Sequence, residues 1–395
     1  MKILYVINHA AFFVSHRKVI ADKAAKNGYI PILLTGQGSS KKMEEDAKRI
    51  ISESSIEHFI APFSSGSMNV FLELFGFLKL LWQVKKIKPE IIHTASPKGN
   101  LYGGLAAFFC KVPSLLISVS GQGFINTESN SKNIIRVVFR HIFNTLMKII
   151  LRHPNKYIVF QNENDIDYFC NNFKLKNNEI IKVGGSGVDL DLFKKLDNAK
   201  EKIVLLPSRL LYDKGINEFV SAVMIVSKKY TDWRFIIAGS YDYESPAAVD
   251  QDTIKKWKQI SNLEIIGYVP HIETLFSKSS IVCLPSYREG FPKCLMEASA
   301  ASCAIITTDV VGCRDAIVDD KTGILVNVRD HKDLANKLDF LISISIVDLP
   351  SNIVGSKGVV KSTALLNSSI VFLVSILSIP SIFSISSSMD LPSTK

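Results

Sequence analysis

The stretch "KILYVINHAAFFVSHRKVIADKAAKNGYIPILLTG" (residues 2–36) carries the pattern that decides the fold. Apolar, β-branched runs at 2–8 and 30–36 predict buried strands, and residues 15–29 between them predict a helix that ends at Gly28. Strand, helix and strand in this order are typical of a parallel sheet with helices packed on its faces. The first run has one early lysine and no small-residue cleavage site, so it predicts a strand and not a signal peptide.

The same alternation continues along the chain in two series. The first series places further apolar runs at 89–95, 114–120 and 156–162. A charged segment, "KKLDNAKEK" at 194–202, has the composition of a linker. The second series has runs at 203–209, 234–240, 263–269, 280–286, 303–309 and 323–328. We therefore predict two doubly wound α/β domains, residues 1–193 and 194–341, because single cores rarely grow beyond about 250–300 residues.

The composition is that of a globular protein with a basic surface. Of the 395 residues, 47% are hydrophobic and 21% are charged, and the formal net charge is +10. This charge suggests a polyanionic surface or substrate, although a solvated basic surface explains it equally well. The lysines and arginines are scattered, without zinc-finger spacing or an aromatic RNA-binding signature, so we expect no nucleic acid partner. The six cysteines lack CxxC pairs and mostly lie in apolar runs, which predicts buried thiols in the cytosol and argues against a cysteine metal site.

Candidate site residues follow several strands of the second series. Ligands of doubly wound folds bind beyond the carboxyl ends of the strands, so the cleft between two such domains is the expected site. The candidates at these strand ends are Arg209, Lys214, residues 238–240, residues 268–271 with Val269, and residues 286–300. They lie far apart in sequence, and we expect the fold to gather them at one cleft.

The segment "SYREGFPKCLMEASA" at 286–300 places two carboxylates around the start of a helix. Pro292 suits the first helical position, so we expect Glu289 in the preceding loop and Glu297 on the second turn. The free N–H groups near 291–293 and the positive end of the helix dipole favour an anion such as phosphate. Taken alone, the two acids could instead have structural roles, one as a partner of the helix dipole and the other as a solvent-exposed side chain. Together with the arginine and lysine above, they fit a diphosphate flanked by hydroxyl-bearing rings.

These motifs have a family resemblance. "EGFPKCLMEA" at 289–298 resembles the E-x7-E motif of the retaining GT-B glycosyltransferases of family 4, and "SRLLYDKG" at 208–215 resembles the Arg/Lys pair of that family. Further segments resemble the family in the same order, at 12–29, 91–107, 157–169, 185–193 and 312–326. The resemblance covers residues 1 to about 341. It implies a GT-B fold, in which two Rossmann-like domains face a cleft, and a bacterial enzyme that builds O-antigen, capsule or other glycans on polyprenyl carriers from UDP-sugars.

The resemblance also implies roles for residues of the donor side. Arg209 and Lys214 would hold the donor diphosphate and stabilise the charge on the leaving group, while Glu289 would bind hydroxyls of the transferred sugar. Glu297 would bind the ribose, and the remaining donor-binding positions would be Gly290, Phe291, Pro292 and Val269. No metal and no cofactor are then expected, because the two cations supply the electrostatic stabilisation. Retention would proceed by front-face attack, without a covalent nucleophile.

The acceptor side departs from the best-known pattern of the family. Ser120 stands where many relatives carry a histidine, and with Gly121 it fits a branch that has a hydroxyl residue before Gly-x-Gly. That branch favours an N-acetylhexosamine as the transferred sugar. His16, Arg17 and Lys98 are candidates for the acceptor side, where they would meet its diphosphate. A histidine at a helix start and a surface arginine are the structural alternative for the first two.

Two segments suggest contact with an anionic membrane. Residues 68–88 and 133–156 interleave lysines and arginines with large apolar side chains, as interfacial helices do. The alternative is that both helices pack in the core of the first domain with snorkelling basic residues. A lipid-linked acceptor would favour a cytoplasmic enzyme that is peripheral on the inner face of the cytoplasmic membrane.

The end of the chain does not fit the family. Residues 342–395 are almost uncharged and rich in serine, and they show no amphipathic helical stripe. A frame disruption that replaced the family's ending would explain this tail and would leave it disordered or prone to aggregate. The uncharged stretch between Lys361 and Asp390 is long enough to span a bilayer, although its serines and Pro380 weaken that interpretation.

Two other functions stay open at this point. The atypical tail is compatible with a catalytically impaired glycosyltransferase-like partner subunit or remnant, which would bind UDP without transferring a sugar. A GT-B epimerase acting on UDP-N-acetylglucosamine is a further alternative, but its relatives use a different set of acids and histidines in the cleft.

Overall fold

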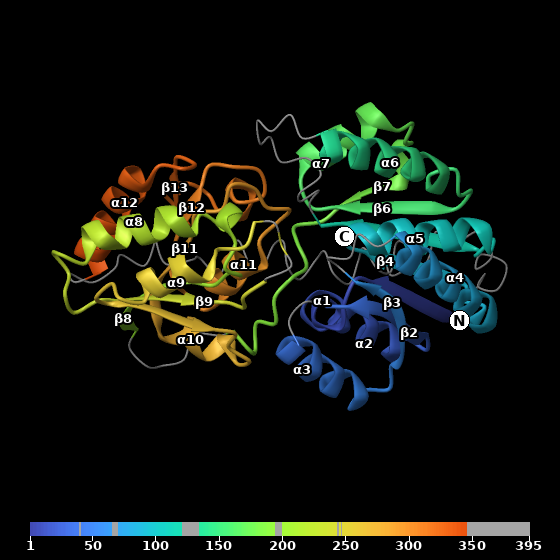
Figure 1. The fold of residues 1–395 in the computed structure, drawn as a ribbon, viewed down its shortest axis with the longest axis horizontal. Coiled ribbons are helices and arrows are strands. Elements are labelled where there is room, and N and C mark those ends of the chain that lie inside the picture. Colours follow the sequence, from blue (N-terminus) through green and yellow to red (C-terminus); the bar gives the residue numbers. More distant parts are fainter. Residues whose placement is uncertain are drawn as a thin grey trace, which may run out of the picture.

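The computed structural model describes residues 1–38, 41–64, 70–120, 134–193, 200–242, 245 and 247–345. Figure 1 shows two domains side by side, each built around its own sheet. Our predictions for Gly121 and for the chain beyond residue 345 lie outside the described residues.

The first domain contains a seven-stranded parallel sheet with the order β3-β2-β1-β4-β5-β6-β7. Its strands are β1 Lys2–Ile7, β2 Ile30–Gln37, β3 Glu57–Ser64, β4 Ile91–Ala95, β5 Ser114–Val119, β6 Lys156–Phe160 and β7 Ile180–Lys182. Its helices are α1 Ala10–His16, α2 Lys18–Lys26, α3 Lys41–Ser52, α4 Val70–Ile87, α5 Pro97–Phe109, α6 Ile134–Ile150 and α7 Glu163–Asn172. The strand order reverses between β1 and β4, as it does in doubly wound folds.

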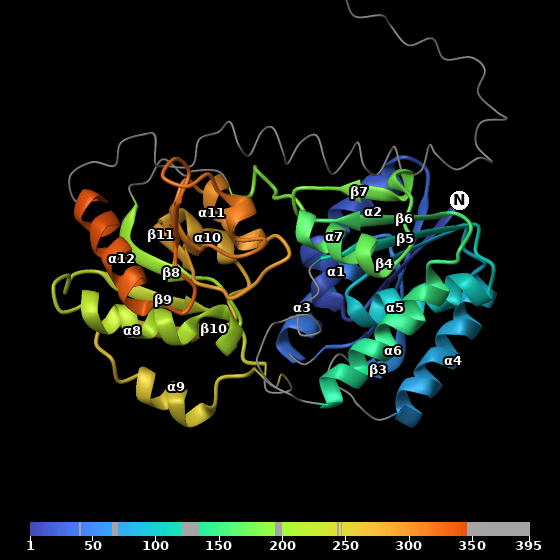
Figure 2. The same ribbon diagram turned by 90° about the horizontal axis from the view of Figure 1, so that it is seen from above.

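Both faces of this sheet are covered by helices, because successive strand residues point to opposite sides. In β1, Leu4 and Val6 join the core under α4 to α7, whereas Ile3, Tyr5 and Ile7 join the core under α1 to α3. Figure 2 shows α4, α5 and α6 together on one side of the domain. The near-continuous apolar strand runs of the sequence therefore reflect burial on two faces.

The second domain repeats this construction with six parallel strands in the order β10-β9-β8-β11-β12-β13. The strands are β8 Glu201–Leu206, β9 Arg234–Ala238, β10 Leu263–Gly267, β11 Ser279–Leu284, β12 Ala304–Thr308 and β13 Ile324–Val326. The helices are α8 Ile216–Val226, α9 Gln251–Trp257, α10 Ile272–Lys278, α11 Lys293–Ala300 and α12 His331–Ser345. The predicted fold class, two doubly wound domains, is confirmed.

The prediction of a single helix over 15–29 was wrong. The helical segment begins at Ala10, because the His9 side chain accepts a hydrogen bond from the Phe12 N–H at 3.2 Å and caps α1. Histidine is not a common N-cap, so the sequence pattern does not reveal this start. The chain then breaks at Arg17 between α1 and α2, whereas Gly28, at φ +81°, follows the end of α2 as expected.

All six cysteines are free thiols, and three of them, Cys283, Cys303 and Cys313, are buried. Cys170 is exposed, so the expectation of buried thiols holds for only part of the set. Across the described ranges, no helix is both long enough and apolar enough to cross a membrane.

Candidate functional site

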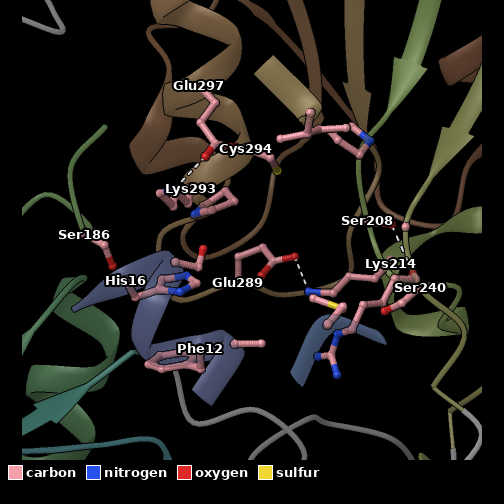
Figure 3. A pocket seen from close by; sticks show the side chains of 18 of the residues that line it. Phe12, His16, Ser186, Ser208, Lys214, Ser240, Glu289, Lys293, Cys294 and Glu297 are labelled. Atoms are coloured by element: carbon pink, nitrogen blue, oxygen red, sulfur yellow. Dashed lines mark hydrogen bonds and ion pairs between the residues drawn. The ribbon is translucent and has the colours of Figure 1, made fainter. Parts of the chain in front are cut away.

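A cavity of about 600 Å³ lies between the two domains and is lined by residues of both. The first domain contributes residues that follow β1, β5 and β6, and the second contributes those that follow β8, β9 and β10. The loop before α11 and the first turns of α11 complete the lining (Figure 3). Every strand concerned ends at this cavity, as parallel doubly wound sheets require.

Lys214 and Glu289 form an ion pair inside this cavity. The Lys214 Nζ lies 2.5 Å from Glu289 Oε1, and the two side chains are only 18% and 15% exposed. Burial alone would disfavour the ammonium, but the nearby carboxylates of Glu289 and Asp213 outweigh it, and the pKa of Lys214 is raised. Ser286 Oγ also donates to Glu289 Oε1 at 2.8 Å. Lys214 is therefore a fixed positive charge, and Glu289 is held in one orientation.

Arg209 reaches the same cavity from the end of β8. Its Nη1 donates to Asp242 Oδ2 at 2.5 Å, and the guanidinium is about half exposed. Lys214 is placed next to it by a short turn that closes at Gly215, where φ is +69°. A side chain at Gly215 would lie 1.9 Å from the Pro285 carbonyl oxygen, so this turn requires glycine. The fold thus brings the predicted arginine and lysine together.

Glu297 lies on the second turn of α11, as predicted. It is nearly buried, and Lys293 Nζ donates to its Oε1 at 2.7 Å. The prediction for Pro292 was off by one position: it has extended ψ and is the N-cap residue, and α11 begins at Lys293. Pro292 has no N–H, so the free N–H groups of the first turn belong to the residues after it, and Pro292 and Lys293 both line the cavity.

The loop that carries Glu289 is held from three sides. The Glu289 N–H donates to the Val311 carbonyl at 3.1 Å. Gly312, at φ +81°, lies so close that a Cβ there would be 2.5 Å from the Glu289 carbonyl oxygen. From the first domain, Asn162 Nδ2 donates to the Gly290 carbonyl at 2.9 Å. The Glu289 carboxylate is therefore positioned by residues of both domains.

A second contact between the domains supports the same loop. Arg288 Nη2 lies 3.1 Å from Asp165 Oδ1, and Asp165 is fully buried. Asn162 also accepts the Asp165 N–H at 2.8 Å, so it caps α7 while it holds Gly290. The first turn of α7 and the loop before α11 form one hydrogen-bonded unit.

Arg17 is a buried cation beside the cavity. It is 4% exposed, and its guanidinium donates to the His16 carbonyl at 2.9 Å, to Ser186 Oγ at 3.3 Å and to Ser120 Oγ at 3.2 Å. Among the described residues, no carboxylate lies within ion-pair distance of it, and its Nε has no partner. Burial lowers the pKa of Arg17 to about 10, so it stays charged at neutral pH. The structural alternative of a surface arginine is therefore wrong.

His16 lines the cavity directly. Its ring stacks on Phe12 with the centroids 4.3 Å apart, and its buried Nδ1 has no hydrogen-bond partner within the described part of the chain. Burial, together with Arg17 and Lys293, lowers the pKa of His16 to about 3, so the ring is neutral. It ends α1 instead of starting a helix, which also contradicts the structural alternative.

Two acceptor-side candidates differ in position. Ser120 lines the cavity and accepts from Arg17, so it lies where the sequence predicted. Lys98 lies in the first turn of α5, where its Nζ is 2.9 Å from Glu73 Oε1, and it is not one of the lining residues. The strand-end position of Lys98 was predicted correctly, but its side chain pairs with α4.

Several lining residues were not predicted from the sequence. Glu44 of α3 accepts the Ala10 and Ala11 N–H groups at 3.2 and 3.0 Å. Burial would raise the pKa of Glu44, but hydrogen bonds from His9 and from these amides lower it overall. Other lining residues that were not predicted individually include His9, Phe12, Ser15, Gln161, Ser186 and Asp213, whereas Lys293 and Cys294 fall in the candidate segment 286–300 but had no role assigned to their side chains. Lys293 could have been found, because it lies four residues before Glu297, whereas Glu44 is one of several acids in a polar helix.

No group of three or more potential metal-ligating side chains occurs within the part of the chain that the structure describes. The polar groups of the cavity include cations, the carboxylates of Glu289 and Glu297 that pair with lysines, and several hydroxyls. This set can bind a substrate that has both negative charge and many hydroxyl groups.

Comparisons with known proteins agree with this arrangement. Residues 188–354 match the model of the glycosyl transferases group 1 family, and residues 2–153 match that of the glycosyl transferase 4-like family. The N,N'-diacetylbacillosaminyl-diphospho-undecaprenol alpha-1,3-N-acetylgalactosaminyltransferase of Campylobacter jejuni is 27% identical over 353 residues, which cover 85% of this chain and 88% of the relative. The capsular polysaccharide biosynthesis glycosyltransferase CapM of Staphylococcus aureus is 26% identical over 69% of this chain and 73% of its own.

Solved structures share the fold at low sequence identity. The sucrose-phosphate synthase of Thermosynechococcus elongatus superposes with a TM-score of 0.75 at 15% identity, covering 98% of this chain and all of that one. The Anabaena protein HepE in complex with UDP-glucose gives a TM-score of 0.67 at 15% identity, covering 97% and 99%. With one family model on each domain and this two-domain architecture around the cavity, the chain belongs to the GT-B glycosyltransferases that combine a 4-like first domain with a group 1 second domain.

Proposed function

We propose that this protein transfers a hexose or N-acetylhexosamine from a UDP-sugar to a polyprenyl-diphosphate-linked glycan, with retention and without a metal ion, in the synthesis of a surface polysaccharide. The observation that carries the proposal is the single cavity in which Arg209, Lys214, Glu289 and Glu297 meet the start of α11. The name of the Campylobacter jejuni relative supports the acceptor class, since it includes an undecaprenol-diphosphate-linked sugar.

The donor diphosphate would lie between the two cations and the first turn of α11. Lys214 and Arg209 now contact carboxylates, and a diphosphate would take over those contacts, leaving Glu289 free to accept sugar hydroxyls. Glu297 would accept the ribose hydroxyls, beside the backbone of residues 290–292 and Val269. Substrate binding thus exchanges one set of ion pairs for another in a site that is already polar and oriented.

The reaction needs charge stabilisation at the leaving group. The bond between the anomeric carbon and the donor phosphate oxygen breaks, and the acceptor hydroxyl oxygen bonds the same carbon from the same face. The acceptor proton passes to the departing phosphate oxygen, so the products are the extended glycan and UDP. Lys214 and Arg209 stabilise the charge that grows on that phosphate, a contribution that is typically worth about 10²- to 10³-fold in rate for each donor.

Acceptor binding falls to the wall formed by the first domain. Arg17 is a desolvated cation that has no carboxylate partner among the residues the structure describes, and its donors face the hydroxyls of Ser120 and Ser186 at the cavity. We assign it, with neutral His16, to the negatively charged diphosphate of the acceptor. Lys98 follows the end of β4 at the same edge of the sheet, but it pairs with Glu73 and does not line the cavity. A lipid-linked acceptor also implies peripheral contact with the inner face of the cytoplasmic membrane.

The test is a transfer assay with the full-length protein, a panel of radiolabelled UDP-sugars and polyprenyl-diphosphate-linked acceptor in membranes. Lys214→Ala and Glu289→Ala are expected to lower transfer by about 10²-fold or more, whereas Lys228→Ala, an exposed lysine of the same domain, should leave it unchanged. The anomeric configuration of the product tests retention, and activity after chelation tests metal independence. Unchanged transfer in both cavity variants would refute the assignment, and UDP binding without any transfer would indicate a non-catalytic protein.

A further inference from the structure

Helix α4 has two apolar faces, and only one of them is buried. Leu80, Val84 and Ile87 pack into the core of the first domain. On the opposite side, five large side chains are exposed: Phe71 at 86%, Leu74 at 54%, Phe75 at 60%, Leu78 at 54% and Trp82 at 58%. At 3.6 residues per turn these five fall within an arc of about 100°. We call them, with the lysines defined below, the α4 surface.

This clustering sets α4 apart from the other described helices. Exposed large apolar residues elsewhere occur as isolated residues or short pairs, such as Met224 and Ile225 of α8. Single exposed apolar residues are normal, but a contiguous strip marks an interaction site. The strip continues over three turns of a helix at the margin of the domain, in the layer with α5 and α6 (Figure 2).

Charge around the strip indicates its partner. Lys79, Lys85 and Lys86 are exposed on α4, and Lys86 Nζ lies 5.3 Å from the centre of the Trp82 ring. The acid of the helix, Glu73, turns instead toward α5, where it contacts Lys98 and Tyr102. A strip of aromatic and leucine side chains, flanked on the same helix by exposed lysines, is complementary to a surface that is apolar beneath and anionic above, which describes a bilayer containing acidic lipids.

The position of α4 suits this partner. The Lys98–Glu73 pair joins the first turns of α5 and α4, so both helices start at the carboxyl edge of the sheet. The cavity residues that follow β1 and β5 lie at that same edge. A membrane in contact with the α4 surface would therefore lie beside the edge at which a lipid-linked acceptor has to enter.

We propose that the α4 surface docks into the interface of an anionic bilayer, with α4 lying along the membrane plane and its apolar strip inserted among the lipid headgroups. The proposal rests on the proposed function, because a lipid-linked acceptor gives the docking its purpose. The bilayer positions the enzyme, and the cavity carries out the chemistry.

Trp82 supplies a direct readout in the full-length protein. Of the three tryptophans, Trp233 is buried and Trp257 lies in α9 of the other domain. Vesicles of equal parts phosphatidylglycerol and phosphatidylcholine should shift the emission to the blue, and brominated lipids should quench it, with both effects lost in Trp82→Phe. Phosphatidylcholine vesicles alone should bind more weakly, and salt should weaken binding to the anionic vesicles.

Substitutions separate the docking from the chemistry. Phe71→Ser with Phe75→Ser should weaken vesicle binding by about tenfold or more, and Lys85→Glu with Lys86→Glu should do so on anionic vesicles only. The matched control, Met224→Ser with Ile225→Ser, removes two exposed apolar residues from the other domain and should bind normally. With a short-chain acceptor in solution, all variants should transfer sugar at the wild-type rate, whereas the Phe variant should be slow on acceptor embedded in vesicles.

Two results would overturn the proposal. One is vesicle binding that the α4 substitutions do not change, or a Trp82 emission that lipids do not affect. The other is a dimer in solution that the Phe substitutions dissociate, which would assign the strip to a second copy of the chain. If the wild-type protein transferred no sugar to the short-chain acceptor, the proposed function would be refuted, but the result on membrane docking would still hold.

Discussion

Arg17 gives the sharpest test of the acceptor side, because its role in folding and its role in binding predict opposite results. A buried arginine that holds the structure together is strongly destabilising to remove, by about 3–5 kcal/mol when a buried partner is left uncompensated. Arg17 has no carboxylate partner among the described residues, so its replacement by the apolar Arg17→Met leaves no buried acid behind.

The balance of free energies can be estimated from the structure. Burial lowers the pKa of Arg17 to about 10, whereas the ordinary value is near 12.5. At about 1.4 kcal/mol for each pH unit, the charged form costs about 3 kcal/mol in the folded state. The three hydrogen bonds of the guanidinium offset this by about 1 kcal/mol each. The net change in the free energy of unfolding for Arg17→Met is therefore expected within about 1 kcal/mol of zero.

The sign of the pH dependence follows from the same lowering. A base whose pKa is lower in the folded state destabilises that state at every pH below the folded pKa, and the cost disappears only as pH rises past the unfolded value. For Arg17 this cost begins to decrease only near pH 10. The difference in the free energy of unfolding between wild type and Arg17→Met should therefore not change with pH between pH 6 and 9.

Activity should behave differently from stability. Loss of a desolvated cation from an anionic ligand typically costs about 2–5 kcal/mol, so kcat/KM for the diphosphate-linked acceptor should fall by about 30-fold or more. The assays are thermal unfolding, in which 1 kcal/mol corresponds to about 2–4 °C for a domain of this size, and initial rates at varied acceptor concentration. A variant that unfolds much more than 4 °C lower with unchanged kcat/KM would refute the reasoning, because Arg17 would then be structural.

Three further predictions follow from contacts described above. Gly312→Ala should displace the Glu289 backbone and raise the KM for the UDP-sugar at least several-fold, whereas Gly28→Ala, which has a similar positive φ but nothing within 4 Å of the new Cβ, should cost only about 1–2 kcal/mol of stability and leave the rates unchanged. Burial holds the pKa of His93 near 3, so the unfolded state binds a proton before the folded state does as pH falls below about 6.5; the urea midpoint should drop between pH 7 and 5, and less so in His93→Phe. Arg288→Met leaves the buried α7 carboxylate without its cation and should lower the free energy of unfolding by about 3 kcal/mol, measurable by urea denaturation.

The fold could be predicted from the sequence because its signals are local. Apolar runs mark the strands, and Gly28 marks the end of α2. The cavity positions of Lys214 and Glu289 were equally accessible to prediction, since both belong to compact motifs. The start of α1 was missed because a histidine caps it, and Pro292 was misplaced by one residue because proline fits both positions.

The remaining site residues depend on contacts between distant parts of the chain. Nothing near Arg17 in the sequence shows that its guanidinium is buried against Ser186, which lies 169 residues away. Asp165 is one of several acids in a polar helix, and its contact with Arg288 spans 123 residues. The first pairing is created by the folding of the first domain and the second by the packing of the two domains, so local patterns of charge and hydrophobicity contain neither.

The unit formed by the first turn of α7 and the loop before α11 limits how this enzyme can be recombined. Asn162 and Asp165 belong to one domain but hold the loop that presents Glu289 from the other. A chimaera that takes its second domain from a relative would contain the glutamate at this position without the two first-domain residues that orient its loop. If Glu289 binds the sugar as proposed, donor specificity can be exchanged between relatives only when these two residues are transferred together with the second domain. Both domains, and not one of them alone, would then determine which sugar is used.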